Sequence, residues 1–266
     1  MWKWEAVNPK AVIVMVHGAA EHHGRYKWLI EKWKKEGYHV IMGDLPGQGN
    51  ISKNERGHID RFDVYIEAVE SWYKEALTYN LPVVLLGHSM GALTVLRTMQ
   101  EKQLDVSSLV LSSPCLGIAQ TTSPSPFLDA ASKVLNVITP TLRMDTGLTQ
   151  EMATRNEEVL EFDRNDPLYV KKVSIRWFRE LIHSIELAFQ NINKLPDVPM
   201  LFMQGGSDQI VNKHKGKEFF AQLKLSDVTY KEWQELYHEI FNEPERDEVF
   251  QYTKQFVESH LPTNVQ

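Results

Sequence analysis

The sequence of 266 residues contains one cysteine, Cys115, and a single cysteine excludes an intramolecular disulfide. A chain of this length can bury a core without such cross-links. Long apolar runs are also missing. The run nearest the N-terminus, Ala11–Val16, is far shorter than the roughly 20 residues of a membrane-spanning helix, and no small-residue cleavage site follows it. These absences predict a cytoplasmic protein.

Positive charge is in deficit, because 29 Lys and Arg residues face 35 Asp and Glu residues, which gives a net charge of −6. An acidic balance gives no reason to expect a nucleic acid as partner. The apolar fraction of 42% and the charged fraction of 24% are those of an ordinary globular protein. No sequence feature sets an oligomeric state.

Short β-branched apolar runs alternate with amphipathic patterns. The runs predict buried strands at residues 11–16, 39–44, 83–86, 107–113, 199–204 and 227–233. Helical spacing falls between them, and residues 62–76 carry apolar side chains on one helical face. Strands separated by helices predict an α/β fold, with a mainly parallel sheet and helices on both of its faces.

One segment interrupts this alternation between the fourth predicted strand and the fifth. It opens with the linker-like stretch Thr121–Pro126 and continues with helical patterns, without a clear strand. A segment of this length must be structured, so we expect a helical cap inserted before the last two strands. The predicted division is core at residues 1–118, cap at residues 119–195 and core again at residues 196–266.

The motif GHSMG, Gly87–Gly91, has the form G-x-S-x-G and stands directly between a predicted strand and a predicted helix. This context is the one that a nucleophile elbow requires, because the serine must sit exposed at the tip of a sharp turn. Ser89 is therefore the predicted nucleophile of a serine hydrolase. A turn without chemistry is the alternative reading of the same residues.

A serine hydroxyl needs a base, and the elbow arrangement predicts an acid and then a histidine further along the chain. His238 lies in the loop between the last predicted strand and the last helix, where its ring can reach the sheet edge. Asp208 follows the strand at residues 199–204, and we predict that it orients the histidine. Asp44 and Asp166 are rival acids that fit the order less well.

Acyl transfer also needs two donors for the oxyanion of the tetrahedral intermediate. We expect the backbone N–H of Met90, the residue after the serine, and that of Ala19 in the loop after the first buried strand. His22 and His23 are adjacent but show no third ligand at metal spacing. No metal and no organic cofactor is predicted.

Together these residues resemble the monoglyceride lipase and lysophospholipase family of α/β-hydrolases. The resemblance follows the family's order over nearly the whole chain, and the first and last of its segments are more specific than the elbow. The matching segments are His17–Tyr26, Gly43–Ser52, Gly87–Ala92, Asn165–Leu168, Gln204–Val211 and Tyr237–Phe250. The resemblance implies a triad of Ser89, Asp208 and His238, with oxyanion donors at Ala19 and Met90. The cap matches the family less well than the core, and the cap shapes the substrate pockets.

Three functions are compatible with these residues. The first is hydrolysis of a single-chain lipid ester, a monoacylglycerol or a lysophospholipid, with peripheral membrane contact through the cap. Its acyl channel would use the apolar cap residues Phe127, Leu128, Leu135, Trp177, Phe178 and Phe189. The second is an aminopeptidase or amidase, which would hold an ammonium group with the cap carboxylates Asp129, Asp145, Glu151, Glu157, Glu158 and Glu161. The third is a catalytically silent binding scaffold, and a short-chain carboxylesterase is a variant of the first.

Overall fold

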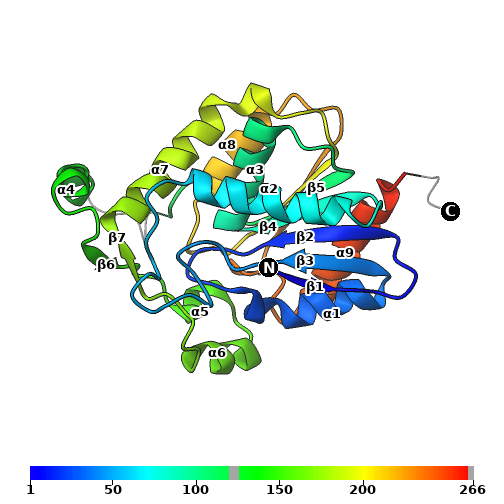
Figure 1. Ribbon diagram of the computed structural model, residues 1–266, viewed down its shortest axis with the longest axis horizontal. Coiled ribbons are helices and arrows are strands. Elements are labelled where there is room, and N and C mark those ends of the chain that lie inside the picture. The colour runs from blue at the N-terminus through cyan, green and yellow to red at the C-terminus, as the bar shows by residue number, and fades with distance from the viewer. Residues whose placement is uncertain (120–125, 263–266) are drawn as a thin grey trace.

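The computed structural model of the chain describes residues 1–119 and 126–262. Its centre is a seven-stranded sheet with the order β1-β3-β2-β4-β5-β8-β9 (Figure 1). The strands are β1 Trp2–Trp4, β2 Ala11–Val16, β3 Tyr38–Met42, β4 Val83–His88, β5 Ser108–Ser112, β8 Met200–Gly205 and β9 Val228–Trp233. All pairs are parallel except β1 with β3, so the prediction of a mainly parallel sheet is confirmed.

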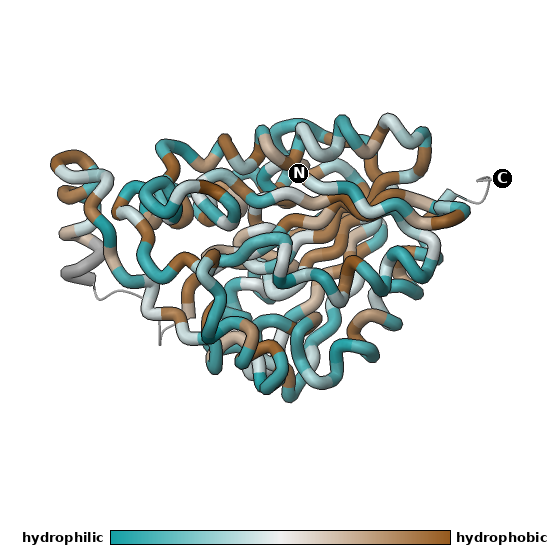
Figure 2. Tube along the Cα trace, turned by 60° about the horizontal axis from the view of Figure 1, so that its bottom comes forward, coloured by the Kyte–Doolittle hydropathy of each residue, from teal (hydrophilic) through white to brown (hydrophobic). Residues whose placement is uncertain are grey.

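Helices cover both faces of this sheet. Helices α1 and α9 lie against one face, and α2, α3, α7 and α8 contribute to the core on the other. Their bounds are α1 Lys27–Lys35, α2 Asp63–Leu77, α3 Met90–Lys102, α7 Ile175–Gln190, α8 Lys213–Gln222 and α9 Arg246–Ser259, with short 3-10 helices η1 His23–Tyr26 and η2 Ile192–Lys194. Every residue of β2 is buried, and alternate residues enter the two cores. Figure 2 shows this hydrophobic centre between helices of mixed hydropathy.

The segment between β5 and β8 contains the expected helices and two strands that were not expected. Its helices are α4 Pro126–Ile138, α5 Gln150–Ala153, α6 Glu157–Arg164 and α7. Strands β6, Arg143–Asp145, and β7, Lys172–Ser174, pair antiparallel within it, and the helical patterns of the sequence did not predict them. Strands of three residues, such as β1, β6 and β7, are too short for the sequence to show the alternation of apolar and polar residues that predicts a strand.

In Figure 1, α4 stands at the far end of this segment, away from the sheet, whereas α7 runs back over α3. Residues 121–125 of the predicted linker lie outside the described residues, and the division into core and cap remains a prediction. Among the described residues, no helix combines the length and the hydropathy that a bilayer span demands.

Candidate active site

Ser89 sits at the junction of β4 and α3 in a backbone conformation that few residues adopt. Its φ is 52° and its ψ is −120°, a left-handed value that costs a non-glycine residue about 1–3 kcal/mol. Gly91 permits the turn, because a Cβ at this position would lie 2.2 Å from the carbonyl oxygen of Val16. The expected strand, turn and helix around this serine are therefore present.

Hydrogen bonds hold the strained turn from both sides. The N–H of Ser89 donates to the carbonyl of Ser112 on β5 at 2.9 Å, and the carbonyl of Ser89 accepts the N–H of Cys115 at 3.1 Å. The N-terminus of α3 begins at Met90, so the positive end of its helix dipole lies beside the serine. This placement favours negative charge that develops next to Ser89.

The structure brings Asp208 and His238 together. The Oδ2 atom of Asp208 lies 2.8 Å from Nδ1 of His238, and both side chains are buried. The other carboxylate oxygen accepts the N–H groups of Ile210 and Val211, which fixes the plane of the carboxylate. Within the described chain, Nε2 of His238 takes part in no hydrogen bond, and His238 and Ser89 line the same pocket. The ring therefore presents a free nitrogen to that pocket.

Burial lowers the pKa of the His238 imidazole, but the neighbouring Asp208 carboxylate, aided by Glu239 and Glu21, raises the pKa above its ordinary value. The ring of His88 lies beside this ring, tilted by 55°, at a centroid distance of 4.8 Å. Burial lowers the pKa of His88 to about 3, so that this second histidine stays neutral. Oε1 of Glu21 lies 3.6 Å from Nε2 of His88, whereas Oδ2 of Asp208 lies at the hydrogen-bonding distance of 2.8 Å from Nδ1 of His238, and that shorter contact makes His238 the more basic of the two.

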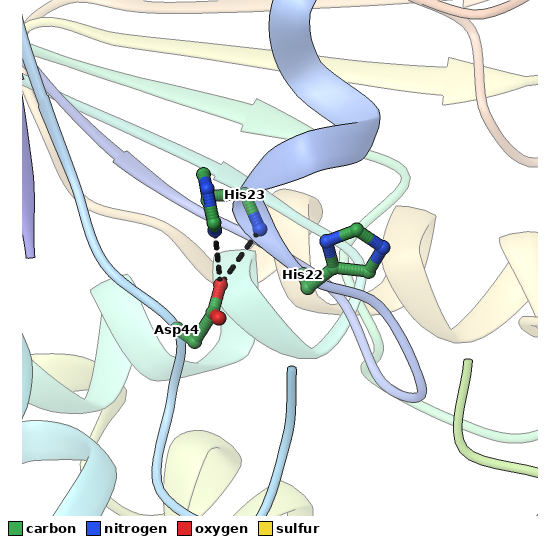
Figure 3. Close-up of side chains that lie close together, drawn as sticks. All are labelled: His22, His23 and Asp44. Carbon is green, nitrogen blue, oxygen red and sulfur yellow. Dashed lines mark hydrogen bonds and ion pairs between the residues drawn. The ribbon is translucent and has the colours of Figure 1, made fainter. Parts of the chain in front are cut away.

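The rival acids Asp44 and Asp166 contact other histidines, and Figure 3 shows the contact of Asp44 with His23. Asp44 accepts the backbone N–H of His23 and lies 2.8 Å from Nδ1 of the same residue, while Asp166 lies 2.7 Å from Nε2 of His22. Asp44 also provides the third ligand atom that the sequence did not show beside the histidine pair. The Nδ1 atom of His22 accepts the N–H of Gly24, so both of its ring nitrogens are already engaged. Hydrogen bonds account for this cluster, and we assign no metal to it.

A cavity of about 290 Å³ lies above Ser89. Ala19 and Met90, the expected oxyanion donors, line it, and neither amide N–H donates a backbone hydrogen bond within the described residues. Its apolar walls include Ile118, Met144, Tyr169, Val173, Trp177, Phe178, Leu181, Ile210 and Val211. Its charged or titratable residues are Glu21, Asp145, His238 and Glu239.

The cap residues named from the sequence divide between this cavity and other places. Trp177 and Phe178 line it, whereas Phe189 packs edge-on against Phe219 and Leu135 lies elsewhere. Among the described side chains of the predicted ammonium-binding set, Asp145 is the one that reaches the cavity. The other described members are exposed at Glu151, Glu157, Glu158 and Glu161. The side chains of Phe127, Leu128 and Asp129 lie outside the described residues.

Sequence reasoning missed a buried charge cluster behind the site, formed by Glu21, Arg25, Asp163 and Glu239. Arg25 bridges all three carboxylates. Two of the conspicuous segments, His17–Tyr26 and Tyr237–Phe250, already contained Glu21, Arg25 and Glu239. Charged residues within these two segments were the available signal for the cluster. Asp163 lies in neither segment, so no sequence signal pointed to it.

Comparison with known proteins places this chain in a family. Residues 7–245 match the family described as "Serine aminopeptidase, S33". Phospholipase YtpA of Bacillus subtilis is 50% identical over 262 residues, with 98% of this chain and 100% of that protein covered. The human monoglyceride lipase is 31% identical, with 89% of this chain and 78% of that protein covered.

A solved structure agrees with these relatives. The crystal structure of the monoacylglycerol lipase of Paleococcus ferrophilus superimposes with a TM-score of 0.87 at 30% identity, and the match covers 97% of this chain and 98% of that one. The resemblance inferred from the sequence motifs is thereby confirmed, as is the α/β-hydrolase fold. This chain belongs to the serine aminopeptidase S33 family of α/β-hydrolases, among the phospholipases and monoglyceride lipases.

Proposed function

We propose that this protein hydrolyses carboxylic esters of single-chain lipids through an acyl-enzyme on Ser89. The observation that carries the proposal is the 2.8 Å contact between Asp208 and His238 beside an apolar cavity that Ser89 also lines. His238 is the general base, and Asp208 fixes its tautomer and stabilises the imidazolium. The phospholipase and lipase names of the relatives agree with this chemistry.

The cycle has two halves. The Nε2 atom of His238 takes the hydroxyl proton of Ser89 as the serine oxygen attacks the ester carbonyl, and the N–H groups of Ala19 and Met90 stabilise the resulting oxyanion. The imidazolium then protonates the departing alcohol, which leaves the acyl group on Ser89. Water, deprotonated by the same histidine, attacks the acyl-enzyme, and the fatty acid departs as Ser89 recovers its proton.

The charge of the cavity favours a neutral head group. No lysine or arginine lines it among the residues that the structure covers, whereas Glu21, Asp145 and Glu239 do. A substrate head group that carries a phosphate or a carboxylate would lack a cationic partner there. We therefore propose monoacylglycerols as better substrates than lysophospholipids, although the Bacillus subtilis relative is named a phospholipase.

The aminopeptidase alternative is less well supported. An ammonium group needs carboxylates that are free to pair with it. Glu21 and Glu239 already contact the buried guanidinium of Arg25, so among the described carboxylates of the cavity Asp145 alone is left for that role. The aromatic and aliphatic walls instead suit an acyl chain.

Peripheral membrane contact through the cap is part of the proposal. Helix α4 exposes Val134, Val137 and Ile138 on one face, with 59%, 81% and 69% of each side chain accessible. Such an apolar face on a helix at the edge of the molecule can enter the headgroup region of a bilayer. Val137→Glu should reduce co-sedimentation with phosphatidylcholine vesicles, whereas Phe162→Glu on α6 provides a control at another exposed apolar residue.

Hydrolysis assays test the central claim. We expect turnover of monoacylglycerols graded by chain length, weaker turnover of the matching lysophosphatidylcholines, and no turnover by Ser89→Ala. A fluorophosphonate should label the wild type and Cys115→Ala but not Ser89→Ala. Activity restricted to acetyl and butyryl esters would refute the proposal that the substrates are lipid esters. Cleavage of aminoacyl amides in preference to esters would favour the aminopeptidase function.

A further inference from the structure

Arg25 lies at the centre of a charge cluster directly behind the candidate histidine. Only 2% of its side chain is accessible. Its Nε donates to Oδ1 of Asp163 at 2.9 Å, its Nη2 donates to the other oxygen of Asp163, and its Nη1 donates to Glu239 at 2.9 Å. Glu21 lies 3.4 Å from the same guanidinium. A planar fork with paired contacts fixes relative positions more tightly than a single hydrogen bond does.

The carboxylates on this guanidinium come from separate parts of the chain. Glu239 immediately follows His238, and its backbone N–H donates to the carbonyl of Ala153 at 2.8 Å. Asp163 belongs to α6, and both Ala153 and Asp163 fall within the segment predicted to be a substrate cap. The loop of the histidine is thus attached to this segment through a backbone contact and through Arg25.

Glu243 forms a second attachment on the far side of the same loop. Its side chain is completely buried, and it accepts hydrogen bonds from the hydroxyl of Thr154 at 2.7 Å and from the N–H of Arg155 at 2.6 Å. Its other oxygen accepts the N–H of Tyr237, the residue before the histidine, at 3.2 Å. Residues 153–155 therefore contact both ends of the 237–243 loop.

We propose that the α5–α6 part of the predicted cap is a scaffold for the catalytic histidine, with Asp163 acting through Arg25 and Glu239 as a positioning residue for His238. The proposal rests on the proposed function of His238 as the base. No strand or helix holds His238, because it lies in the loop between β9 and α9. Its precision must come from side chains, and the buried bridges supply it.

The cluster also sets the electrostatic surroundings of the ring. Burial raises the pKa of the Glu239 carboxyl, but Arg25 outweighs burial and lowers that pKa, so Glu239 stays ionised. The charged or titratable groups around His238 are Asp208 after β8, Glu239 in its own loop, Glu21 after β2, His88 at the end of β4, and Arg25 in η1. Loss of the Glu239 charge therefore weakens the support for the imidazolium.

The test compares Asp163→Asn and Glu239→Gln with Glu158→Gln. Glu158 pairs with Arg246 on the exposed side of the same α6 helix, so its variant is the matched control. The substrate is p-nitrophenyl butyrate, which is too short to need the acyl channel, and fluorophosphonate labelling is followed in parallel. We expect Asp163→Asn to lower kcat by about 10–10²-fold with little change in KM, as a displaced catalytic group does. Glu239→Gln should also move the acidic limb of kcat/KM to lower pH, and Glu158→Gln should behave like the wild type.

Two outcomes would overturn the proposal. One is that folded Asp163→Asn and Glu239→Gln keep wild-type kcat, labelling rate and pH profile. The other is that they raise KM for long-chain esters alone, which would make this segment a substrate cap and nothing more. If Asp163→Asn does not fold, the pH profile of Glu239→Gln tests the proposal instead. A loosened fold would lower activity without a shift of the acidic limb to lower pH. The Ser89→Ala variant separates this inference from the proposed function. If Ser89→Ala still hydrolyses the ester, the proposed function is refuted. If Ser89→Ala is inactive but Asp163→Asn and Glu239→Gln keep wild-type activity, this inference alone is refuted.

Discussion

Replacement of Asp208 by asparagine tests the proposed acid without a change of shape. The side chain is fully buried, and its Oδ1 accepts the N–H groups of Ile210 at 2.8 Å and Val211 at 3.0 Å. An amide oxygen can accept both of these bonds, so the loop after β8 should survive. The amide nitrogen then replaces Oδ2, which lies 2.8 Å from Nδ1 of His238.

The exchange reverses the hydrogen bond to the histidine. A carboxylate accepts a hydrogen bond from Nδ1–H, whereas an amide NH₂ donates a hydrogen bond to an unprotonated Nδ1, so the neutral ring must carry its proton on Nε2. A protonated Nε2 cannot take the hydroxyl proton of Ser89. The equivalent change in a serine protease triad lowers kcat by about 10⁴-fold. At about 1.36 kcal/mol for each factor of ten, the transition state loses roughly 5.4 kcal/mol.

The assay is steady-state hydrolysis of p-nitrophenyl butyrate and of a monoacylglycerol, with thermal unfolding measured on the same preparations. Asp166→Asn is the control, because this aspartate makes a similar contact, 2.7 Å, to a different histidine, His22. We expect Asp166→Asn to lose far less activity than Asp208→Asn. A folded Asp208→Asn enzyme with wild-type kcat would refute the assignment of Asp208 and transfer the acid role to another residue.

Three further predictions follow from single features of the site. The raised pKa of His238 should place the acidic limb of the kcat/KM profile above the ordinary pKa of an imidazole, which a pH–rate profile checks. Activity requires the neutral ring, so it is lost as the pH falls through the pKa of His238. Gly205→Ala should lower both Tm and kcat, because the added Cβ would lie 2.1 Å from the carbonyl oxygen of Tyr237, the residue before His238. Each kcal/mol lost from the free energy of unfolding should lower the Tm measured by calorimetry by about 2–4 °C. Burial raises the pKa of Cys115 to about 12, so iodoacetamide should modify the native thiol far more slowly than the unfolded one, as mass spectrometry would show.

The sheet and its catalytic edge could be predicted from sequence because their signals are local. The strands β2, β4, β5 and β8 are compact apolar runs with recognisable neighbours. Ser89 follows β4 directly, and Asp208 lies in the short loop after β8. Parallel strands bring their carboxyl ends to one edge of the sheet, so the order of the runs along the chain already implied proximity of these two side chains. The contact of Asp208 with His238 follows from the same reasoning.

The charge cluster could not be predicted, because its contacts are long-range and its members look ordinary in sequence. Arg25 and Asp163 are 138 positions apart, and Arg25 and Glu239 are 214 positions apart. Asp163 stands in an acidic amphipathic helix whose other carboxylates, such as Glu157 and Glu161, face solvent. A periodic pattern says which face of a helix is apolar, but it does not say which charged residue lies at the boundary and meets a buried partner.

The three proposed catalytic residues therefore depend on the fold in different ways. Ser89 is positioned by a strained turn between β4 and α3, and Asp208 by two backbone N–H groups of its own loop after β8, those of Ile210 and Val211, so local backbone structure places both. His238 lies 2.8 Å from Asp208, but its own backbone belongs to a loop without regular structure. This loop is where the buried bridges of Arg25 and Glu243 converge. Side-chain contacts are concentrated where secondary structure gives no support, which is the arrangement expected if they determine the position of the base.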